Sequence, residues 1–153
     1  MKSINKYFPK SKKIPIDEFI ENALYDKNYG YYSKKIPFGK KGDFVTAPEI
    51  SFLFSEMIAL WVVSLWCHLK KPKIFNLVEL GPGSGKMSLI LHDVFKKFPD
   101  FFDSTNIFLY EKSKSLKRLQ KKKLLNKKIK WIKNFNIIKS GPVIFLGNEF
   151  FDA

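Results

Sequence analysis

The sequence predicts an α/β fold in which helices pack against a parallel β-sheet. Two observations support this prediction: short apolar segments of strand length alternate with helical patterns, and a glycine-rich turn directly follows the first of these segments. The chain has 153 residues, 45% of them hydrophobic, which is enough to bury one core. The predicted strands are residues 74–80, 106–111, 128–132 and 142–148.

Residues 1–70 are predicted to form a helical segment that packs on a sheet domain of residues 71–153. An amphipathic helix is expected to start after Pro15 and to end near Gly30, because five apolar side chains recur on one helical face. These side chains are Ile16, Phe19, Ile20, Ala23 and Leu24.

A long apolar helix is predicted from Pro48 to about Leu69, with Thr46 as its N-cap. Its most apolar part, residues 51–69, is at the short end of the roughly 20 residues that a membrane span needs. It also carries Glu56 in its first half. We therefore expect a buried core helix and no membrane span.

After the first strand, the second half of the chain predicts a helix, a strand, a helix, a strand, a loop and a last strand. The helix after the first strand has its apolar positions at i, i+3, i+4 and i+7, and these are Met87, Ile90, Leu91, Val94, Phe95 and Phe98. The segment "PDFFDSTN" is interpreted as an insertion before the second strand, and a lysine-faced helix follows at 115–125. The continuous apolar strand 142–148 is expected to be buried on both faces and to pair with the first strand, leaving an open edge.

The glycine-rich turn "VELGPGSGKM" excludes three common sites. A phosphate-binding loop needs a hydroxyl where Met87 stands, and its first glycine lies one residue too close to the second. A dinucleotide turn needs glycine at the position of Lys86, so that fit is incomplete. An esterase elbow centred on Ser84 is excluded by Pro82 and Lys86 on either side.

An acid followed by alternating glycines fits a different ligand. Glu79 at the end of a strand can orient an ammonium group, and the helix after the turn favours a carboxylate at its N-terminus. Glu111, which ends the next strand, stands where an acid holds ribose hydroxyls. S-adenosylmethionine carries all three groups and is the predicted cofactor. A plain tight turn and a solvated strand-end acid remain the structural alternatives.

Four motifs, "GDFVTAPEIS", "VELGPGSGKM", "YEKSKSLKRLQ" and "GNEFFDA", resemble in this order the MidA family of S-adenosylmethionine-dependent methyltransferases. The resemblance extends from about Pro15 to Ala153. It implies a Rossmann-like class I methyltransferase fold with an N-terminal helical cap. It also implies protein-arginine methylation, since mitochondrial members of the family are complex I assembly factors that methylate an arginine of a complex I subunit.

The resemblance also assigns site residues. It makes the glycine loop the methionine side of the cofactor site, Glu111 the ribose acid, and Glu149 and Asp152 the catalytic acids that hold the substrate guanidinium. The other cofactor-binding residues that it implies are Glu79, Gly81, Pro82, Gly83, Gly85, Asp43, Thr46 and Asn148. Glu49 is expected to approach the cofactor from the N-terminal side. Family loops more often carry arginine and threonine or serine where this chain has Ser84 and Lys86.

Family members are more than about twice as long as this chain. The chain is therefore expected to be truncated after the fourth strand, with a missing C-terminal half or a partner chain completing the sheet. A protein substrate is the expected partner. The expected location is the cytoplasm for a bacterial protein and the mitochondrial matrix for a eukaryotic one.

The net charge of +14 comes almost entirely from lysines spread along the chain, and Arg118 is the sole arginine. We therefore expect no specific nucleic-acid partner, because base recognition relies on arginine forks. Cys67 is the single cysteine, which excludes an internal disulfide. His68 and His92 lack zinc-ligand spacing, so no metal is expected.

Two other function classes remain open. The first is a non-catalytic assembly or interaction module that retains the methyltransferase fold, with or without its cofactor. The second is a basic RNA methyltransferase, whose RNA affinity would be sensitive to salt. The scattered lysines and the single arginine make this second class the weaker one.

Overall fold

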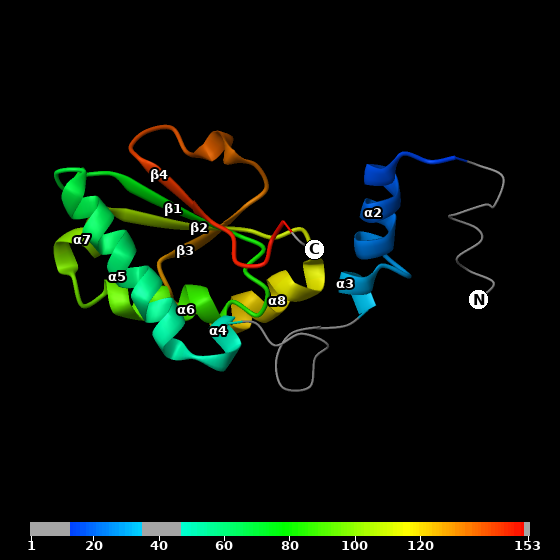
Figure 1. The fold of residues 1–153 in the computed structure, drawn as a ribbon, viewed down its shortest axis with the longest axis horizontal. Coiled ribbons are helices and arrows are strands. Elements are labelled where there is room, and N and C mark those ends of the chain that lie inside the picture. The colour runs from blue at the N-terminus through cyan, green and yellow to red at the C-terminus, as the bar shows by residue number, and fades with distance from the viewer. Residues whose placement is uncertain (1–12, 35–46, 152–153) are drawn as a thin grey trace. The chain divides into compact units, whose positions relative to one another are not determined.

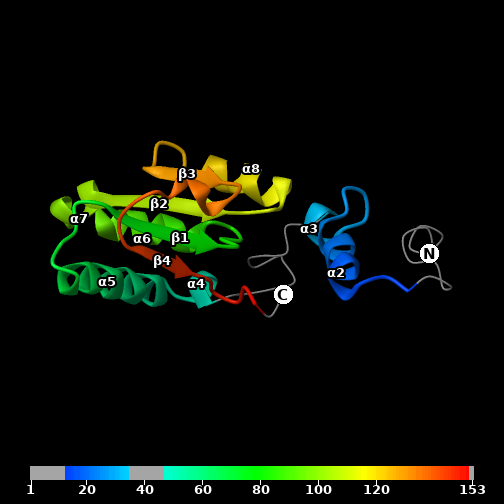
Figure 2. The ribbon, with the colours of Figure 1, turned by 90° about the horizontal axis from the view of Figure 1, so that it is seen from above.

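Four parallel strands form one sheet in the order β3-β2-β1-β4 (Figures 1 and 2). The structure is a computed structural model that describes residues 13–34 and 47–151. The strands are β1 Phe75–Leu80, β2 Thr105–Tyr110, β3 Ile129–Ile132 and β4 Val143–Leu146. All four lie where the apolar segments predicted them, and β4 pairs with β1 at the edge of the sheet, as expected.

Helices cover one face of this sheet. Ribbon views show them on the side opposite the connection between β3 and β4 (Figure 1). The main helices on this face are α5 Phe52–His68, α6 Lys86–Phe95 and α8 Lys114–Lys123. Alternate residues of β1, such as Phe75 and Leu77, are fully buried against them, together with Leu91 and Phe95 of α6. This packing fixes the position of β1 relative to α6, and therefore the position of the turn between them.

The other face of the sheet has a smaller apolar cluster. Val78, Phe108 and Ile132 are buried there, and Ile138 packs against them from the β3–β4 connection. That connection contains the 3₁₀ helix η1, Phe135–Ile137. Within residues 47–151, no α-helix packs on this face.

The outer strand β4 corrects one prediction. Its continuous apolar sequence predicted burial on both faces, but Phe145 is 50% exposed and Val143 is 36% exposed. Ile144 and Leu146 pack on the main core from the other face. On the opposite face, the ring of Phe145 makes an edge contact with the ring of Phe135, and their centroids lie 5.3 Å apart. A central-strand sequence therefore occupies an edge position.

The predicted long helix is two helices. The first, α4, spans Ala47–Ile50. The next residue, Ser51, has extended backbone angles of φ −137° and ψ 130°. The Ser51 hydroxyl then caps α5 by accepting a hydrogen bond from the Leu53 N–H at 3.2 Å. The proposed cap Thr46 lies outside the described residues. Among those residues, no helix is long and apolar enough to cross a membrane.

The segment interpreted as an insertion before β2 forms a helix, α7 (Pro99–Ser104). Pro99 occupies the first helical position, where its missing N–H costs nothing. Phe101 is fully buried and makes edge contacts with the rings of Trp66, Phe75 and Phe95. The helix is therefore part of the core.

Contacts divide the chain into two units, residues 1–36 and 37–153, each described by itself. The first unit contains α2 (Ile16–Tyr25) and α3 (Tyr31–Lys34). Asp26 closes α2 by accepting hydrogen bonds from the N–H groups of Asn28 and Tyr29, both at 2.8 Å. The helix was predicted to end near Gly30, and it ends earlier, at Tyr25, because Asp26 forms this turn. The proposed boundary at residue 70 stays a prediction.

Candidate cofactor site at the carboxyl ends of β1 and β2

The parallel arrangement brings the ends of three strands to one edge of the sheet. Leu80 of β1 lies beside Tyr110 of β2, and Glu79 lies beside Leu146 of β4. The connection from β1 leads to β2 on one side, whereas β4 lies on the other side, so the direction of strand succession changes next to β1. In open α/β sheets, ligands bind outside the carboxyl ends of the strands at such a point.

The glycine loop after β1 uses left-handed backbone conformations. Gly81, Gly83 and Gly85 have φ angles of +59°, +52° and +74°. A Cβ atom at Gly81 would lie 2.7 Å from a ring carbon of Phe150, so a side chain there meets both strain and a neighbour. The Gly85 N–H donates to the Pro82 carbonyl at 2.7 Å, and α6 begins at the next residue. The backbone of this loop can therefore approach a ligand closely.

Glu79 is a buried carboxyl group at the end of β1. Its side chain is 3% exposed and accepts a hydrogen bond from the hydroxyl of Ser88 on α6. Burial raises the pKa of Glu79 to about 7; the Ser88 hydrogen bond opposes this rise, and the negative charge of Glu111 adds to it. A cationic group placed beside Glu79 would stabilise its ionised form, which fits the ammonium group of an amino acid.

Glu111 follows β2 and is 9% exposed. Its Oε1 accepts a hydrogen bond from the Ser113 N–H at 2.8 Å, and its Oε2 accepts one from Nε2 of Gln120 at 3.0 Å. Burial raises the pKa of Glu111, and these two hydrogen bonds together with the charge of Lys117 oppose the rise. The Lys112 N–H also bonds this carboxylate. Since a carboxylate has about four lone-pair sites, the group can still accept a ribose hydroxyl.

Glu49 of α4 binds the glycine loop itself. The hydroxyl of Ser84 donates to Oε1 of Glu49, and Nζ of Lys86 donates to the Glu49 carbonyl at 3.0 Å. Lys86 also lies 4.7 Å from the ring centroid of Phe52. The two loop positions at which this chain departs from the family pattern therefore share one partner. Asp43, another predicted site residue, lies outside the described part of the chain.

The end of β4 is arranged differently. Glu149 is exposed and has a φ angle of +50°, and its carboxylate is 3.4 Å from Nδ2 of Asn148. Phe150 packs against Gly81 and Gly147. Asp152, predicted to assist Glu149, lies outside the described residues. The structure places Asn148 and Glu149 beyond the strand next to β1, while their predicted roles stay predictions.

Gln120 is a site residue that was not predicted from the sequence. This residue of α8 is fully buried and contacts both the glycine loop and Glu111. A weak signal exists, because Gln120 stands between Leu116 and Leu124 at helical spacing and interrupts an otherwise apolar stripe.

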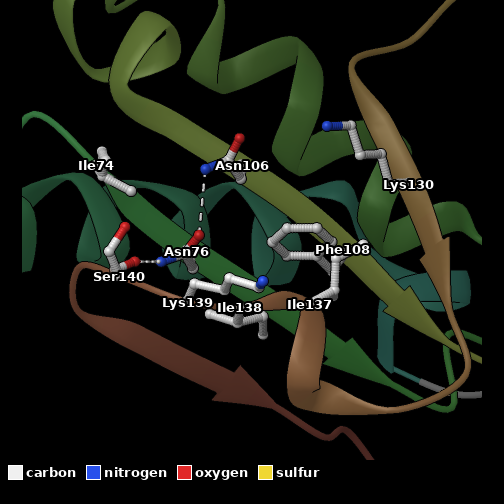
Figure 3. A pocket seen from close by; sticks show the side chains of 9 residues that line it. All are labelled: Ile74, Asn76, Asn106, Phe108, Lys130, Ile137, Ile138, Lys139 and Ser140. Atoms are coloured by element: carbon white, nitrogen blue, oxygen red, sulfur yellow. Dashed lines mark hydrogen bonds between the residues drawn. The ribbon is translucent and has the colours of Figure 1, made fainter.

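A hollow of about 310 Å³ lies elsewhere, over the other face of the sheet (Figure 3). Asn76 and Asn106, near the amino ends of β1 and β2, line it and are joined by a hydrogen bond of 3.2 Å. The Asn76 amide also donates to the Ser140 carbonyl at 2.8 Å. The hollow does not include the predicted site residues. In the described segments, no three His, Cys, Asp or Glu residues gather as metal ligands would.

Comparisons with known protein families, curated proteins and solved structures agree with one another. Residues 57–153 match the family described as "Putative S-adenosyl-L-methionine-dependent methyltransferase". The mitochondrial protein arginine methyltransferase NDUFAF7 of Xenopus laevis is 33% identical over 164 aligned residues, which cover 92% of this chain and 38% of that protein. The human protein of the same name is 30% identical, with 92% and 37% covered. The chain thus spans less than two fifths of the length of these relatives.

Two solved structures from Burkholderia thailandensis have the same fold. One, described as a "likely methyl transferase" bound to S-adenosyl-homocysteine, superposes with a TM-score of 0.72 at 25% identity, covering 94% of this chain and 38% of that one. The other has a TM-score of 0.65 at 22% identity, covering 92% of this chain and 36% of that one. The predicted α/β methyltransferase fold is therefore confirmed.

Proposed function

The chain belongs to the family described as "Putative S-adenosyl-L-methionine-dependent methyltransferase", and we propose that it binds S-adenosylmethionine at the carboxyl ends of β1 and β2. The observation that carries the proposal is the pair of buried carboxyl groups, Glu79 and Glu111, on either side of a loop with three left-handed glycines. The related structure bound to S-adenosyl-homocysteine supports the same ligand class.

In this proposal each part of the cofactor has a partner of suitable chemistry. Glu79 takes the ammonium group, and Glu111 takes the ribose hydroxyls. The amino-acid carboxylate lies near the N-terminus of α6, reached through the loop residues Gly81, Pro82, Gly83 and Gly85. Asp43 and Thr46 approach from the N-terminal side, and Asn148 from the end of β4. Glu49 joins α4 to the glycine loop, so α4 can hold the segment that precedes it close to the loop.

We further propose that the methyl acceptor is an arginine of a protein. The cofactor supplies an activated methyl group on a sulfonium, and the transfer is an in-line displacement in which positioning supplies much of the rate. The role of Glu149 is to accept two hydrogen bonds from the planar guanidinium and to aim one nitrogen at the methyl group. Asp152 assists by adding negative charge on the same segment.

The substrate and the location rest on the relatives. Several of them are named mitochondrial protein arginine methyltransferases, which supports a protein substrate and a mitochondrial location in a eukaryote. We propose an arginine of a complex I subunit as the target. A bacterial chain would act in the cytoplasm. Because the chain covers 38% of the Xenopus laevis relative, these assignments concern the whole protein of which such a chain is the cofactor part.

The exposed position of Glu149 favours a second candidate function. Its carboxylate is weakly held, and the outer face of β4 is uncovered in the described residues. A chain in this state suits an assembly module that binds the cofactor without transferring the methyl group, with a partner chain or a further C-terminal segment completing the sheet. Cofactor binding without turnover, together with a stable protein partner, would favour this candidate.

The test is transfer of a labelled methyl group. The chain is incubated with methyl-tritiated S-adenosylmethionine and a protein extract, and acid hydrolysis then shows which residue carries the label. We expect label in methylarginine, lost in Glu149→Gln and kept in Asp103→Asn, a matched change of an exposed acid on α7. Label in RNA or in another amino acid would contradict the arginine proposal, and binding without label would favour the assembly module.

A further inference from the structure

Gln120 connects the two halves of the candidate cofactor site. It lies on α8, its side chain is fully buried, and the structure gives every polar atom of its amide a partner. Nε2 donates to the Gly83 carbonyl at 2.9 Å and to Oε2 of Glu111 at 3.0 Å. Oε1 accepts a hydrogen bond from the indole N–H of Trp131 on β3 at 2.9 Å.

We propose that Gln120 is a positioning residue that holds the glycine loop at a fixed distance from Glu111, so that one ligand can reach both. This inference rests on the proposed cofactor site. It assigns Gln120 no contact with the ligand. Its action passes through the Gly83 carbonyl on one side and the Glu111 carboxylate on the other.

Only an amide in one orientation satisfies these contacts. Both hydrogens of Nε2 point at acceptors, and a flipped amide would place its oxygen against the Gly83 carbonyl and the Glu111 carboxylate instead. The Trp131 N–H selects the observed orientation, because it can only donate. Three segments distant in sequence therefore determine the position of one side chain.

The stem of Gln120 also supports the loop by packing. A Cβ atom on Gly85 would lie 3.3 Å from Cγ of Gln120 and 3.4 Å from Cδ1 of Leu124. The loop backbone therefore rests on α8 at its third glycine while its second glycine is hydrogen-bonded to the same side chain. Loss of the Gln120 contacts would free the loop, whereas the Ser113 N–H would still hold Glu111.

The charges around Glu111 make a pH profile informative. Glu79 on β1 faces it with a like charge, and Lys117 on α8 faces it with an opposite charge. Gln120 and the Ser113 N–H stabilise the ionised form by hydrogen bonds. Loss of the Gln120 bond therefore raises the pKa of Glu111, and the pH below which cofactor affinity declines moves upward.

The test compares two ligands. S-adenosylmethionine spans both halves of the site, whereas methylthioadenosine has no amino-acid part and uses the ribose acid without the loop. Gln120→Met keeps the volume and removes all three hydrogen bonds. We expect it to weaken S-adenosylmethionine at least tenfold and methylthioadenosine less than threefold, and to move the acid limb of the affinity profile to higher pH. Lys122→Met, an exposed change on the same helix, should bind both ligands like the wild type.

Trp131→Phe is a milder second variant, because it removes only the bond that orients the amide. It should change the two affinities in the same sense by a smaller factor, and it keeps the test valid should Gln120→Met fail to fold. Equal losses for both ligands, or unchanged affinities, would overturn the positioning role alone. A folded wild-type chain that binds neither ligand would overturn the proposed function, and this inference with it.

Discussion

The acids that follow β1 and β2 and the acid that follows β4 differ in how firmly the structure holds them. Glu79 and Glu111 are 3% and 9% exposed, and each accepts hydrogen bonds from α6 or α8 and its cap. Glu149 is exposed, has a left-handed backbone conformation, and lies 3.4 Å from its one described hydrogen-bond partner, Asn148.

This difference follows from the sheet. β1 and β2 are central strands whose buried side chains support the residues after them, whereas β4 is an edge strand with one face uncovered by the described chain. The cofactor end is therefore pre-organised by the core, since a buried network holds side chains in one arrangement. The end of β4, where we propose that the substrate binds, has fewer contacts to hold it. The predictions below test this contrast, beginning with the largest expected effect.

Gly81→Ala should cause the largest loss. Alanine at a φ of +59° is strained by about 1–2 kcal/mol, and its Cβ would also contact Phe150, so the loop must move. We expect S-adenosylmethionine affinity to fall by about 30- to 100-fold, since moving the loop out of its binding geometry costs about 2–3 kcal/mol of binding free energy. Isothermal titration calorimetry measures this change.

Gly141→Ala is the matched control for that loss. Gly141 has a φ of +81°, and a Cβ there would lie 2.4 Å from the Ile74 carbonyl, at the opposite end of the sheet. This variant should lower the melting temperature while its folded fraction binds the cofactor like the wild type. Equal losses of affinity in the two variants would show that the loop has no special role.

Glu79 should link cofactor binding to pH. Because its pKa is about 7, a cationic ammonium group must displace its proton at lower pH, so affinity should rise about tenfold from pH 6 to pH 8. Calorimetry in buffers of different ionisation enthalpy should detect proton release at pH 7. Glu79→Gln should abolish both the rise in affinity between pH 6 and pH 8 and the proton released at pH 7; their persistence would exclude Glu79 as the ammonium partner.

The Glu79 carboxyl group should also make stability depend on pH, in the direction opposite to that of cofactor affinity. A raised acid pKa means that the folded chain binds more protons than the unfolded chain between pH 4.5 and about 7, so the free energy of unfolding falls as pH rises through that interval. At pH 8 without cofactor, Glu79→Gln should therefore be more stable by about 2–3 kcal/mol. Denaturant unfolding at pH 5 and pH 8 checks this, and a destabilised variant at pH 8 would contradict it.

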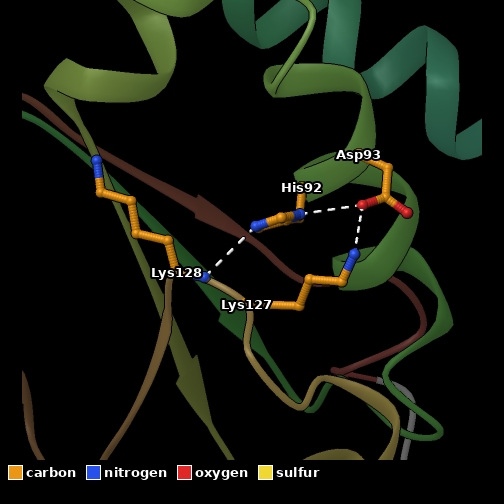
Figure 4. A network of polar contacts seen from close by, with 4 residues as sticks. All are labelled: His92, Asp93, Lys127 and Lys128. Atoms are coloured by element: carbon orange, nitrogen blue, oxygen red, sulfur yellow. Dashed lines mark hydrogen bonds and ion pairs between the residues drawn. The ribbon is translucent and has the colours of Figure 1, made fainter.

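His92 should give the smallest effect, on stability alone. It is buried on α6, accepts a hydrogen bond from the Lys128 N–H, and donates to Asp93, which also binds Lys127 (Figure 4). Burial lowers the pKa of His92, while the Asp93 hydrogen bond opposes this. Its contribution to stability is therefore complete above pH 6.5 and is lost as pH falls below that value.

His92→Gln should lower the free energy of unfolding by about 1 kcal/mol at pH 7.5, because hydrogen bonds are lost. The difference from the wild type should shrink at pH 5.5, because below pH 6.5 the unfolded chain protonates this histidine more readily than the folded chain does. His68→Gln, a change at an exposed histidine, should leave the free energy of unfolding at pH 7.5 close to the wild-type value. A difference that does not vary with pH would contradict the role assigned to His92.

Local sequence patterns predicted most of the fold. β1 and β2 carry apolar side chains on both faces because both faces are covered, whereas the pairing of β4 with β1 was expected from the usual strand order of this fold. The break at Ser51 was missed because apolar residues continue on both sides of it. Burial of both faces of β4 was wrongly predicted, because an apolar sequence does not say whether anything covers it.

The candidate site, like the fold, has parts that could be predicted from the sequence and parts that could not. The proximity of Glu79 and Glu111 could be predicted, since parallel strands bring residues at their carboxyl ends together. The contacts of Gln120 could not, because its partners lie on β3, on the loop after β1 and after β2. The partner of Ser84 and Lys86, Glu49, likewise depends on tertiary packing.

The most direct test of the cofactor site is a titration of S-adenosylmethionine into the 153-residue chain, with Glu111→Ala and Asp103→Ala alongside. Circular dichroism first establishes that all three are folded. We predict saturable binding by the wild type and by Asp103→Ala, and a 10- to 100-fold loss in Glu111→Ala, as expected for about 1.5–3 kcal/mol from hydrogen bonds to a charged group. A folded wild-type chain without binding, or equal affinity in Glu111→Ala, would contradict the proposed site.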